Sequence, residues 1–348
     1  MGLTDFLWAI PVFGILVFIH ELGHFAVAKF FGIRVHEFAL GFGPVLAGFE
    51  RGETRYNWRL VPLGGFVRMA GMEDGDSEDP RGFGRKSILA RSLVIAAGPI
   101  MNFVLAALLY AALLFFIGVD QNTNKLGEIL ATCDTQVAGQ TLSQPCPAYT
   151  AGLRSGDVVL SINGIETTDW TGVQKVVTES QGKPLTFLVQ RGAEQKSLRV
   201  EPIFEGERYM VGIRPAARRE SLGTALVQGG AWTAEVSVMW VKGIGLMITR
   251  KMQVELSGPV GITKTIAETA SHGLANLIQL TAFLSINLGL FNLLPIPALD
   301  GSRLVFILVE GIRGRKIDPA RENVIHFVGF VILIGLMLVI TYKEVVTR

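Results

Sequence analysis

The chain has 348 residues, of which 49% are hydrophobic and only 18% are charged, and its mean hydropathy is +0.42. Soluble proteins carry roughly 25% charged residues, so this composition excludes a disordered, fibrous or disulfide-scaffold protein. The net charge of +2 gives no reason to expect a nucleic-acid partner.

The apolar residues are concentrated in separate segments. The first runs from Phe6 to Ile19 and resumes after a short polar interruption, and three uncharged runs of 28, 26 and 19 residues follow at 92–119, 274–299 and 324–342. A membrane-spanning helix needs about 20 mainly apolar residues. We therefore expect a polytopic α-helical membrane protein with four transmembrane helices, within residues 1–31, 88–119, 274–312 and 322–342. The first segment lacks a basic leading region, which argues against a cleaved signal peptide.

Basic residues near the ends of these segments predict the orientation. They gather in the region 29–91 and in the short loop 313–323, whereas the first five residues contain none. The positive-inside rule then places residues 32–87 and 313–323 in the cytoplasm. Both termini and the long segment 120–273 are expected outside it.

The first span contains the pattern H-E-x-x-H, as His20, Glu21 and His24. On a helix the two histidines lie one turn apart on one face, where they can bind one metal ion. Glu21 lies beside them and can accept a proton from a metal-bound water. Ionisable groups within a span are costly and usually functional. The alternative is a polar cluster that packs helices together, or a span that ends at Ile19.

The polar region 32–87 is expected to form a membrane-associated β-hairpin, because residues 55–72 alternate in character and contain Gly64-Gly65. The outer segment 120–204 has strand and turn signals typical of a small α+β domain. Strands are predicted at 126–130 and 158–162, a helix at 170–180, and a hairpin around Arg191-Gly192.

Cys133 and Cys146 lie in a loop of that outer domain that is rich in Gly, Ser, Pro and Thr. Outside the cytoplasm a disulfide between them can persist. Two unrelated free thiols remain the alternative. Residues 205–273 are expected to be a linker that holds an amphipathic or interfacial helix at 222–249, because a fifth span there would move the next segment to the wrong face.

The third span contains polar and helix-breaking residues within an apolar run: Asn287, Asn292, Pro295, Pro297 and Asp300. The prolines cannot continue a regular helix, and a broken helix at membrane depth needs a protein-lined or water-filled cavity. Asp300 is therefore a candidate oxygen ligand that completes a three-ligand catalytic zinc site with His20 and His24. A loop aspartate outside the membrane is the alternative.

These motifs, in this order and spacing, resemble the site-2 protease family of intramembrane zinc metalloproteases, and within it the bacterial regulator-of-sigma-E protease group. Further matching motifs are Gly41-Phe-Gly-Pro44, Pro62 to Gly71, and Gly98-Pro99-Ile-Met-Asn102. The outer segment, with Ala151 to Asp157 followed by Asn163-Gly164, looks like one bacterial PDZ domain.

The resemblance implies one Zn²⁺ held by His20, His24 and Asp300, with Glu21 as general base. It implies that Asn287 and Asn292 hold the substrate backbone or brace the zinc-bearing helix, and that the β-region around Gly64 and Gly65 pairs with an unwound substrate. A hairpin without substrate contact, and asparagines that only pack helices, are the alternatives.

The function implied is regulated intramembrane proteolysis of single-span membrane proteins, such as anti-sigma factors and signal-peptide remnants, in the bacterial cytoplasmic membrane. The partners are those substrates and the lipid bilayer. We expect the PDZ domain to exclude bulky ectodomains by size. A catalytically silent membrane binding module and a zinc transporter are the competing hypotheses. The intact Glu21 argues against the first, and the single compact ligand set argues against the second.

Overall fold

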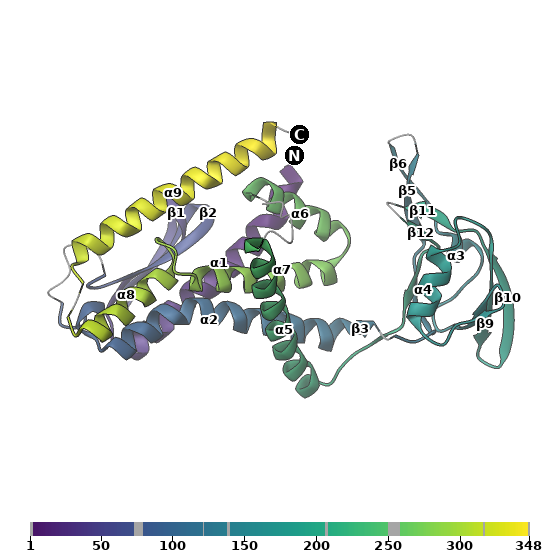
Figure 1. Ribbon diagram of the computed structural model, residues 1–348, viewed down its shortest axis with the longest axis horizontal. Coiled ribbons are helices and arrows are strands. Elements are labelled where there is room, and N and C mark those ends of the chain that lie inside the picture. The colour runs from purple at the N-terminus through teal and green to yellow at the C-terminus, as the bar shows by residue number, and fades with distance from the viewer. Residues whose placement is uncertain are drawn as a thin grey trace. The chain divides into compact units, whose positions relative to one another are not determined.

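The structure is a computed structural model that describes residues 3–72, 79–120, 122–137, 140–205, 208–249, 258–315 and 317–346. The chain forms two compact units, one made of Met1–Leu113 with Leu222–Arg348 and the other of Leu114–Ser221 (Figure 1). Parts of the predicted cytoplasmic region (73–78) and of the predicted linker (206–207 and 250–257) lie outside the described residues.

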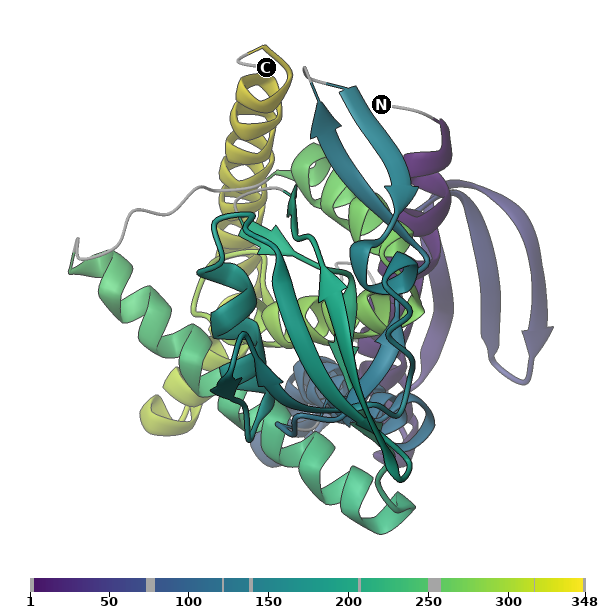
Figure 2. The same ribbon diagram turned by 90° about the vertical axis from the view of Figure 1, so that its right-hand side faces the viewer.

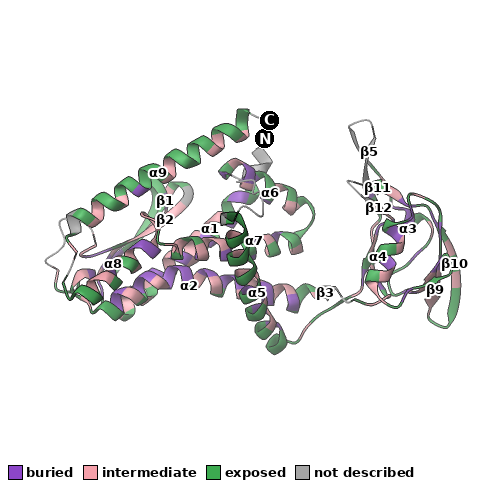
Figure 3. Cartoon of the chain, in the orientation of Figure 1, coloured by how far each residue is buried: buried purple, intermediate pink, exposed green. Residues whose placement is uncertain are grey.

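Four helices in the described part of the chain are long and apolar enough to cross a membrane. They are α1 (Leu3–Phe30), α2 (Ile88–Ala112, followed by a π-helical turn at Leu113–Ile117), α7 (Leu274–Leu293) and α9 (Pro319–Val346). Each predicted span thus overlaps one such helix, and α9 extends beyond the predicted 322–342 at both ends. Figure 3 shows α9 exposed along nearly its whole length, which suits an apolar helix only if lipid covers it.

Three shorter or less apolar helices complete the first unit: α5 (Leu222–Ile248), α6 (Pro259–Ser271) and α8 (Asp300–Arg313). α5 falls where a helix was predicted and is not among the four candidate spans. It packs closely on α2, since a Cβ on Gly229 would meet the Ala107 carbonyl and Trp232 lies edge-on to Tyr110. Its interfacial position stays a prediction.

The hairpin of the first unit consists of β1 (Val35–Arg51) and β2 (Thr54–Met69), which pair antiparallel. Each residue from 37 to 40 has two partners in β2, one in 55–58 and one in 65–68. Both strands therefore double back, and Figure 2 shows them as a folded purple ribbon beside the helices. The hairpin exposes large apolar side chains, which suits membrane association: Phe42, Leu46, Phe49, Trp58 and Leu60.

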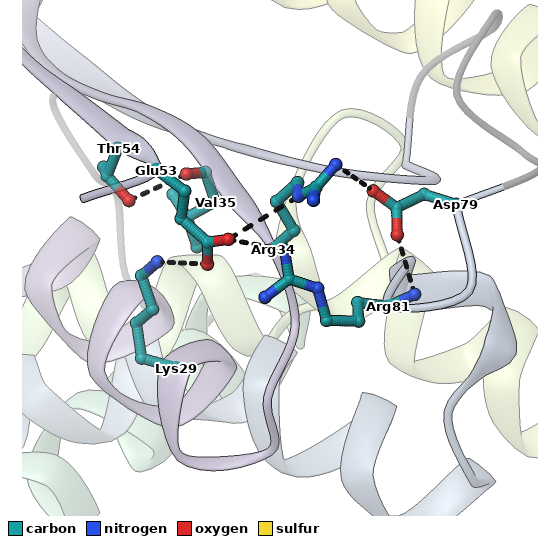
Figure 4. Close-up of polar contacts among 7 residues, drawn as sticks. All are labelled: Lys29, Arg34, Val35, Glu53, Thr54, Asp79 and Arg81. Atoms are coloured by element: carbon teal, nitrogen blue, oxygen red, sulfur yellow. Dashed lines mark hydrogen bonds and ion pairs between the residues drawn. The ribbon is translucent and has the colours of Figure 1, made fainter.

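An ion cluster attaches the turn of this hairpin to the end of α1 (Figure 4). Glu53, in the turn, accepts hydrogen bonds from Lys29 (2.9 Å) and Arg81 (2.5 Å), and Arg34 pairs with Asp79 at 2.9 Å. The hydrogen bond from Lys29, helped by that from Arg81, lowers the pKa of the Glu53 carboxyl to about 2. The hairpin is thus held at the end of the helix that carries the H-E-x-x-H pattern.

The second unit is rich in strands. The main sheet has the order β10-β9-β7-β8, from Glu194–Val200, Leu185–Arg191, Val158–Ile162 and Ile165–Glu166. The other elements are β3 (Val119–Asp120), β4 (Leu126–Ile129), β5 (Thr132–Val137), β6 (Gln140–Pro145), α3 (Pro147–Thr150), α4 (Trp170–Thr178), β11 (Ile203–Glu205), β12 (Arg208–Met210), β13 (Ile213–Pro215) and β14 (Ala217–Arg218). Its core is apolar and includes the fully buried Val159, Val173 and Phe187.

Two expectations for this unit need correction. The segment predicted as a loop contains the paired strands β5 and β6, with Cys133 in β5 and Cys146 directly after β6. The predicted disulfide joins the two cysteines, whose Cα atoms are 5.0 Å apart. The domain also continues beyond residue 204. β13 pairs with β4 and β14 pairs with β3, so long-range pairing extends it to Ser221, and the linker begins later than predicted.

Candidate metal centre

His20 and His24 lie one turn apart on α1, as the spacing predicts. Their Nε2 atoms are 3.2 Å apart, and both residues are buried. An α-helix brings residues four apart together on one face, so the local geometry follows from the sequence alone.

Asp300 is brought to the histidines by the break after α7. The chain leaves α7 at Leu294 in an extended conformation, Ala298 adopts a left-handed φ of 78°, and α8 begins at Asp300. The Ala298 N–H donates to Nδ1 of His326 (3.1 Å), which fixes the break. A Cβ on Gly301 would collide with the backbone of Leu293, so only glycine permits this sharp return.

The three predicted ligands converge in space. Oδ2 of Asp300 lies 3.1 Å from Nε2 of His20 and 3.3 Å from Nε2 of His24. One ligand atom from each residue lies within 4.8 Å of the others, and no other such group occurs among the described residues. Oδ2 is buried without a hydrogen-bond partner in the described structure. A buried, unpaired carboxylate oxygen beside two imidazole nitrogens fits a cation, and this donor set fits zinc.

Helix α2 forms the wall behind the histidines. Nδ1 of His24 donates to the Val94 carbonyl (2.8 Å), and the terminal amide of Asn102 lies 3.0 Å from Nδ1 of His20. A Cβ on Gly98 would lie 2.6 Å from Cε1 of His24 and 2.9 Å from Cε1 of His20. The two rings therefore occupy the space that the absent side chain leaves.

These α2 contacts were not predicted from the sequence. A signal was nonetheless present, because Val94, Gly98 and Asn102 are spaced four apart and so share one helix face. Gly98 and Asn102 entered the sequence argument only within a matching motif.

An ion pair attaches α8 to the same wall. Arg91 of α2 donates two hydrogen bonds to Glu310 of α8, at 2.9 and 2.7 Å, and both side chains are largely buried. A two-bond pair of this kind fixes orientation as well as distance. It holds the helix that begins with Asp300 against the helix that supports the histidines.

Glu21 opens onto a cavity of about 350 Å³ together with the three candidate ligands. Val67 of β2 lines the same cavity, and a Cβ on Gly65 would lie 3.2 Å from Cγ of Glu21, so β2 runs close to this side chain. Gly64, Gly65 and Asn292 also line this cavity, whereas Asn287 is not among its lining residues. Oδ1 of Asn287 is buried without a partner in the described structure. The cavity thus unites every predicted site residue of this unit except Asn287.

Comparisons with known proteins agree with this geometry. Residues 8–336 match the model of peptidase family M50. The chain is 35% identical to a putative zinc metalloprotease of Clostridium perfringens, over 98% of each chain. It is 32% identical to the "Regulator of sigma-W protease RasP" of Bacillus subtilis, over 97% of each chain, and 33% identical to the "Zinc metalloprotease RasP" of Geobacillus kaustophilus, over 97% of this chain and 96% of that one.

The family model covers most of the chain, including α1, α2, α7, α8 and the first part of α9. The alignment with the Clostridium perfringens relative spans 346 positions, close to the length of this chain. Those with the two RasP relatives span 421 and 422 positions, so the RasP proteins contain segments that have no counterpart in this 348-residue chain. The chain therefore belongs to peptidase family M50 and is a zinc metalloprotease.

Proposed function

We propose that this protein is an intramembrane endopeptidase that hydrolyses peptide bonds within the transmembrane segments of single-span membrane proteins. The observation that carries the proposal is the position of Asp300. A carboxylate 280 residues from His20 in the chain lies 3.1 Å from its Nε2, on a cavity that also contains Glu21. α1, which supplies both histidines, and α7, which ends shortly before Asp300, are apolar enough to lie in lipid.

His20, His24 and Asp300 would hold the zinc ion. When bound, zinc supplies Lewis acidity, which polarises a carbonyl and acidifies a water. Glu21 lines the same cavity and would accept the proton of the attacking water and pass it to the leaving amine.

A peptide in lipid is helical, with its carbonyls already hydrogen-bonded, so cleavage requires local unwinding. The cavity offers a partner for the unwound strand, because Gly64 and Gly65 of β2 line it and leave backbone accessible there. Pairing with β2 would satisfy the freed N–H and C=O groups. Asn292 offers a side-chain amide for the same purpose, and Asn287 would brace α7 from a position outside the cavity.

For the location, we propose the bacterial cytoplasmic membrane, with residues 32–87 and 313–323 facing the cytoplasm and both termini outside it. The strand-rich unit, as a PDZ domain, would then lie on the outer face and exclude substrates with intact ectodomains. The name of the Bacillus subtilis relative supports a role in sigma-factor regulation. Anti-sigma factors and signal-peptide remnants are the substrates we infer from the family resemblance.

The test uses the purified full-length protein, a model transmembrane peptide and the variant Glu21→Gln. We expect about one zinc per chain in both proteins, and cleavage reduced by about 10²- to 10⁴-fold in the variant. Glu268→Gln, on the exposed surface of α6, is the matched control and should cleave like the wild type. Equal cleavage by all three proteins would refute the role of Glu21.

The same experiment separates the competing functions. A silent binding module would hold zinc and leave the peptide intact. A transporter would move zinc across a vesicle membrane. Neither the wild type nor Glu21→Gln would then cleave the peptide.

A further inference from the structure

Asn102 is the most deeply buried polar residue next to the candidate ligands. It lies on α2, one turn beyond Gly98, and its side chain is inaccessible to solvent. Its terminal amide lies 3.0 Å from Nδ1 of His20. The amide nitrogen is the atom placed there, and the amide oxygen, Oδ1, is buried without a hydrogen-bond partner in the described structure.

The two ends of an asparagine amide are nearly equivalent in shape, so the hydrogen-bond network must decide which atom faces the histidine. With the nitrogen facing Nδ1, a neutral His20 would carry its proton on Nε2, the atom that points at Asp300. That tautomer cannot bind a metal through Nε2. Either orientation leaves one end of the amide without a partner in the described structure, so the requirement of His20 decides between them.

His24 shows the arrangement that a metal ligand requires. Its Nδ1 faces the Val94 carbonyl, which is an acceptor only, so Nδ1 carries the proton and Nε2 is free. The same requirement applied to His20 calls for an acceptor 3 Å from Nδ1. Rotating the Asn102 amide by half a turn supplies it in the form of Oδ1.

We propose that Asn102 is the positioning residue for His20: its Oδ1 accepts the Nδ1–H of His20 and so holds Nε2 free for zinc. The inference rests on the proposed zinc site and adds the group that sets its tautomer. The two histidines are then supported differently, His24 by a backbone carbonyl and His20 by a side chain. Only the second support can be removed by mutation.

A purely structural role for Asn102 makes different predictions. The Ser285 hydroxyl donates to the backbone carbonyl of Asn102 (2.7 Å), which links α2 to α7 whatever side chain stands at position 102. Ser285 is fully buried as well. Ser285→Ala therefore disturbs the same helix contact without touching His20, and is the matched control.

The experiment compares the full-length wild type with Asn102→Leu, Asn102→Asp and Ser285→Ala, by zinc content in competition with a chelator of known affinity. Leucine has similar size and no acceptor, and should weaken zinc binding about 10- to 100-fold. Aspartate keeps the acceptor and should bind zinc at least as tightly as the wild type. Ser285→Ala should bind zinc like the wild type.

Two results would overturn the inference: wild-type zinc affinity in Asn102→Leu, or an equal loss in Asn102→Asp and Asn102→Leu. Thermal unfolding of the zinc-free proteins shows whether Asn102→Leu folds, and rescue by aspartate distinguishes positioning from packing. If His20→Ala and the wild type held equal zinc, the zinc site itself would be refuted. That result would refute the proposed function. The two results on the Asn102 variants would refute only the positioning role of Asn102.

Discussion

Both compact units enclose apolar side chains, but they differ in the polar groups that they bury and in the apolar groups that they expose. The strand-rich unit encloses an apolar core in which Val159, Val173 and Phe187 are fully buried. The helical unit buries His20, Asn102 and Ser285, while its α9 exposes large apolar side chains. The apolar side chains that α9 exposes suit lipid, whereas the strand-rich unit exposes few large apolar side chains, which suits water. The buried polar side chains of the helical unit surround the candidate metal centre.

Two buried carboxylates sharpen this contrast. Asp157 of the strand-rich unit accepts hydrogen bonds from Arg191 at 2.7 and 2.8 Å and from the Arg154 N–H. Oδ2 of Asp300 has no hydrogen-bond partner in the described structure. A buried carboxylate that accepts from a guanidinium and a backbone N–H stabilises a fold. One whose nearest polar neighbours are two imidazole nitrogens, at 3.1 and 3.3 Å, fits a shared cation.

The largest expected effect comes from removing the ligands of the polar interior. His24→Ala combined with Asp300→Ala should reduce zinc from about one per chain to near zero and abolish cleavage, because two of three protein ligands are lost. Metal analysis and peptide cleavage measure this. His272→Ala, at the exposed end of α6, should retain both zinc and activity. Zinc retained in the double variant would show that the polar interior is not a metal site.

Gly98→Ala tests how closely α2 fits the histidine rings. The added Cβ meets both rings at less than 3 Å, so the rings or the helix must shift. We expect zinc affinity to fall about 10- to 100-fold, with a matching loss of cleavage. Gly14→Ala on α1, where the added Cβ meets nothing within 4 Å, is the control. If both variants bound zinc like the wild type, the close fit of α2 would have no consequence.

The surface contrast is tested by placing the same charge on each unit. Ile332 on α9 is 63% exposed and Ile165 on β8 is 56% exposed. If lipid covers α9, Ile332→Asp should disfavour membrane insertion by about 3 kcal/mol. Ile165→Asp faces water and should change stability by less than about 0.5 kcal/mol. An insertion assay measures the first effect and thermal unfolding measures the second. Similar effects at both sites would contradict the claim that lipid covers α9 while water surrounds the strand-rich unit.

The smallest effect concerns acid and the paired carboxylate Asp157. Burial opposes its charge, but the hydrogen bonds from Arg191 and the Arg154 N–H outweigh burial and hold the pKa of this carboxyl below its ordinary value of 3.8. Its contribution is therefore present above pH 3.8 and lost as the pH falls through the lower, folded-state pKa. Asp157→Asn should cost about 2 kcal/mol at neutral pH.

Hydrogen exchange of the β7 and β9 amides reports this stability within the whole chain. In the wild type, the protection of these amides should fall as the pH is lowered. In Asp157→Asn, the protection at neutral pH should be lower and should fall less in acid. Glu166→Gln, on the exposed strand β8, is the control and should follow the wild type. If amide protection in Asp157→Asn fell as steeply with acid as in the wild type, groups other than Asp157 would govern the acid dependence.

The sequence predicted what local spacing encodes. The four-residue interval of His20 and His24, the number and approximate positions of the four spans and the helix break before Asp300 all reappear in the structure. Contacts between distant segments were harder to foresee. The double pairing of β1 with β2 and the pairing of β13 with β4 depend on register between segments that are distant in the chain. The support of His20 by Asn102 was missed for the same reason, since 82 residues separate them.

The central claim is that a peptide bond is cut at membrane depth by the residues around Asp300. A single-span peptide, reconstituted in vesicles with the full-length protein, allows the products to be located by mass spectrometry. We predict that the zinc-loaded wild type cuts within the apolar span, and that Glu21→Gln with the same zinc content leaves the peptide intact. A cut confined to the polar flanks, or an identical cut by Glu21→Gln, would contradict the account.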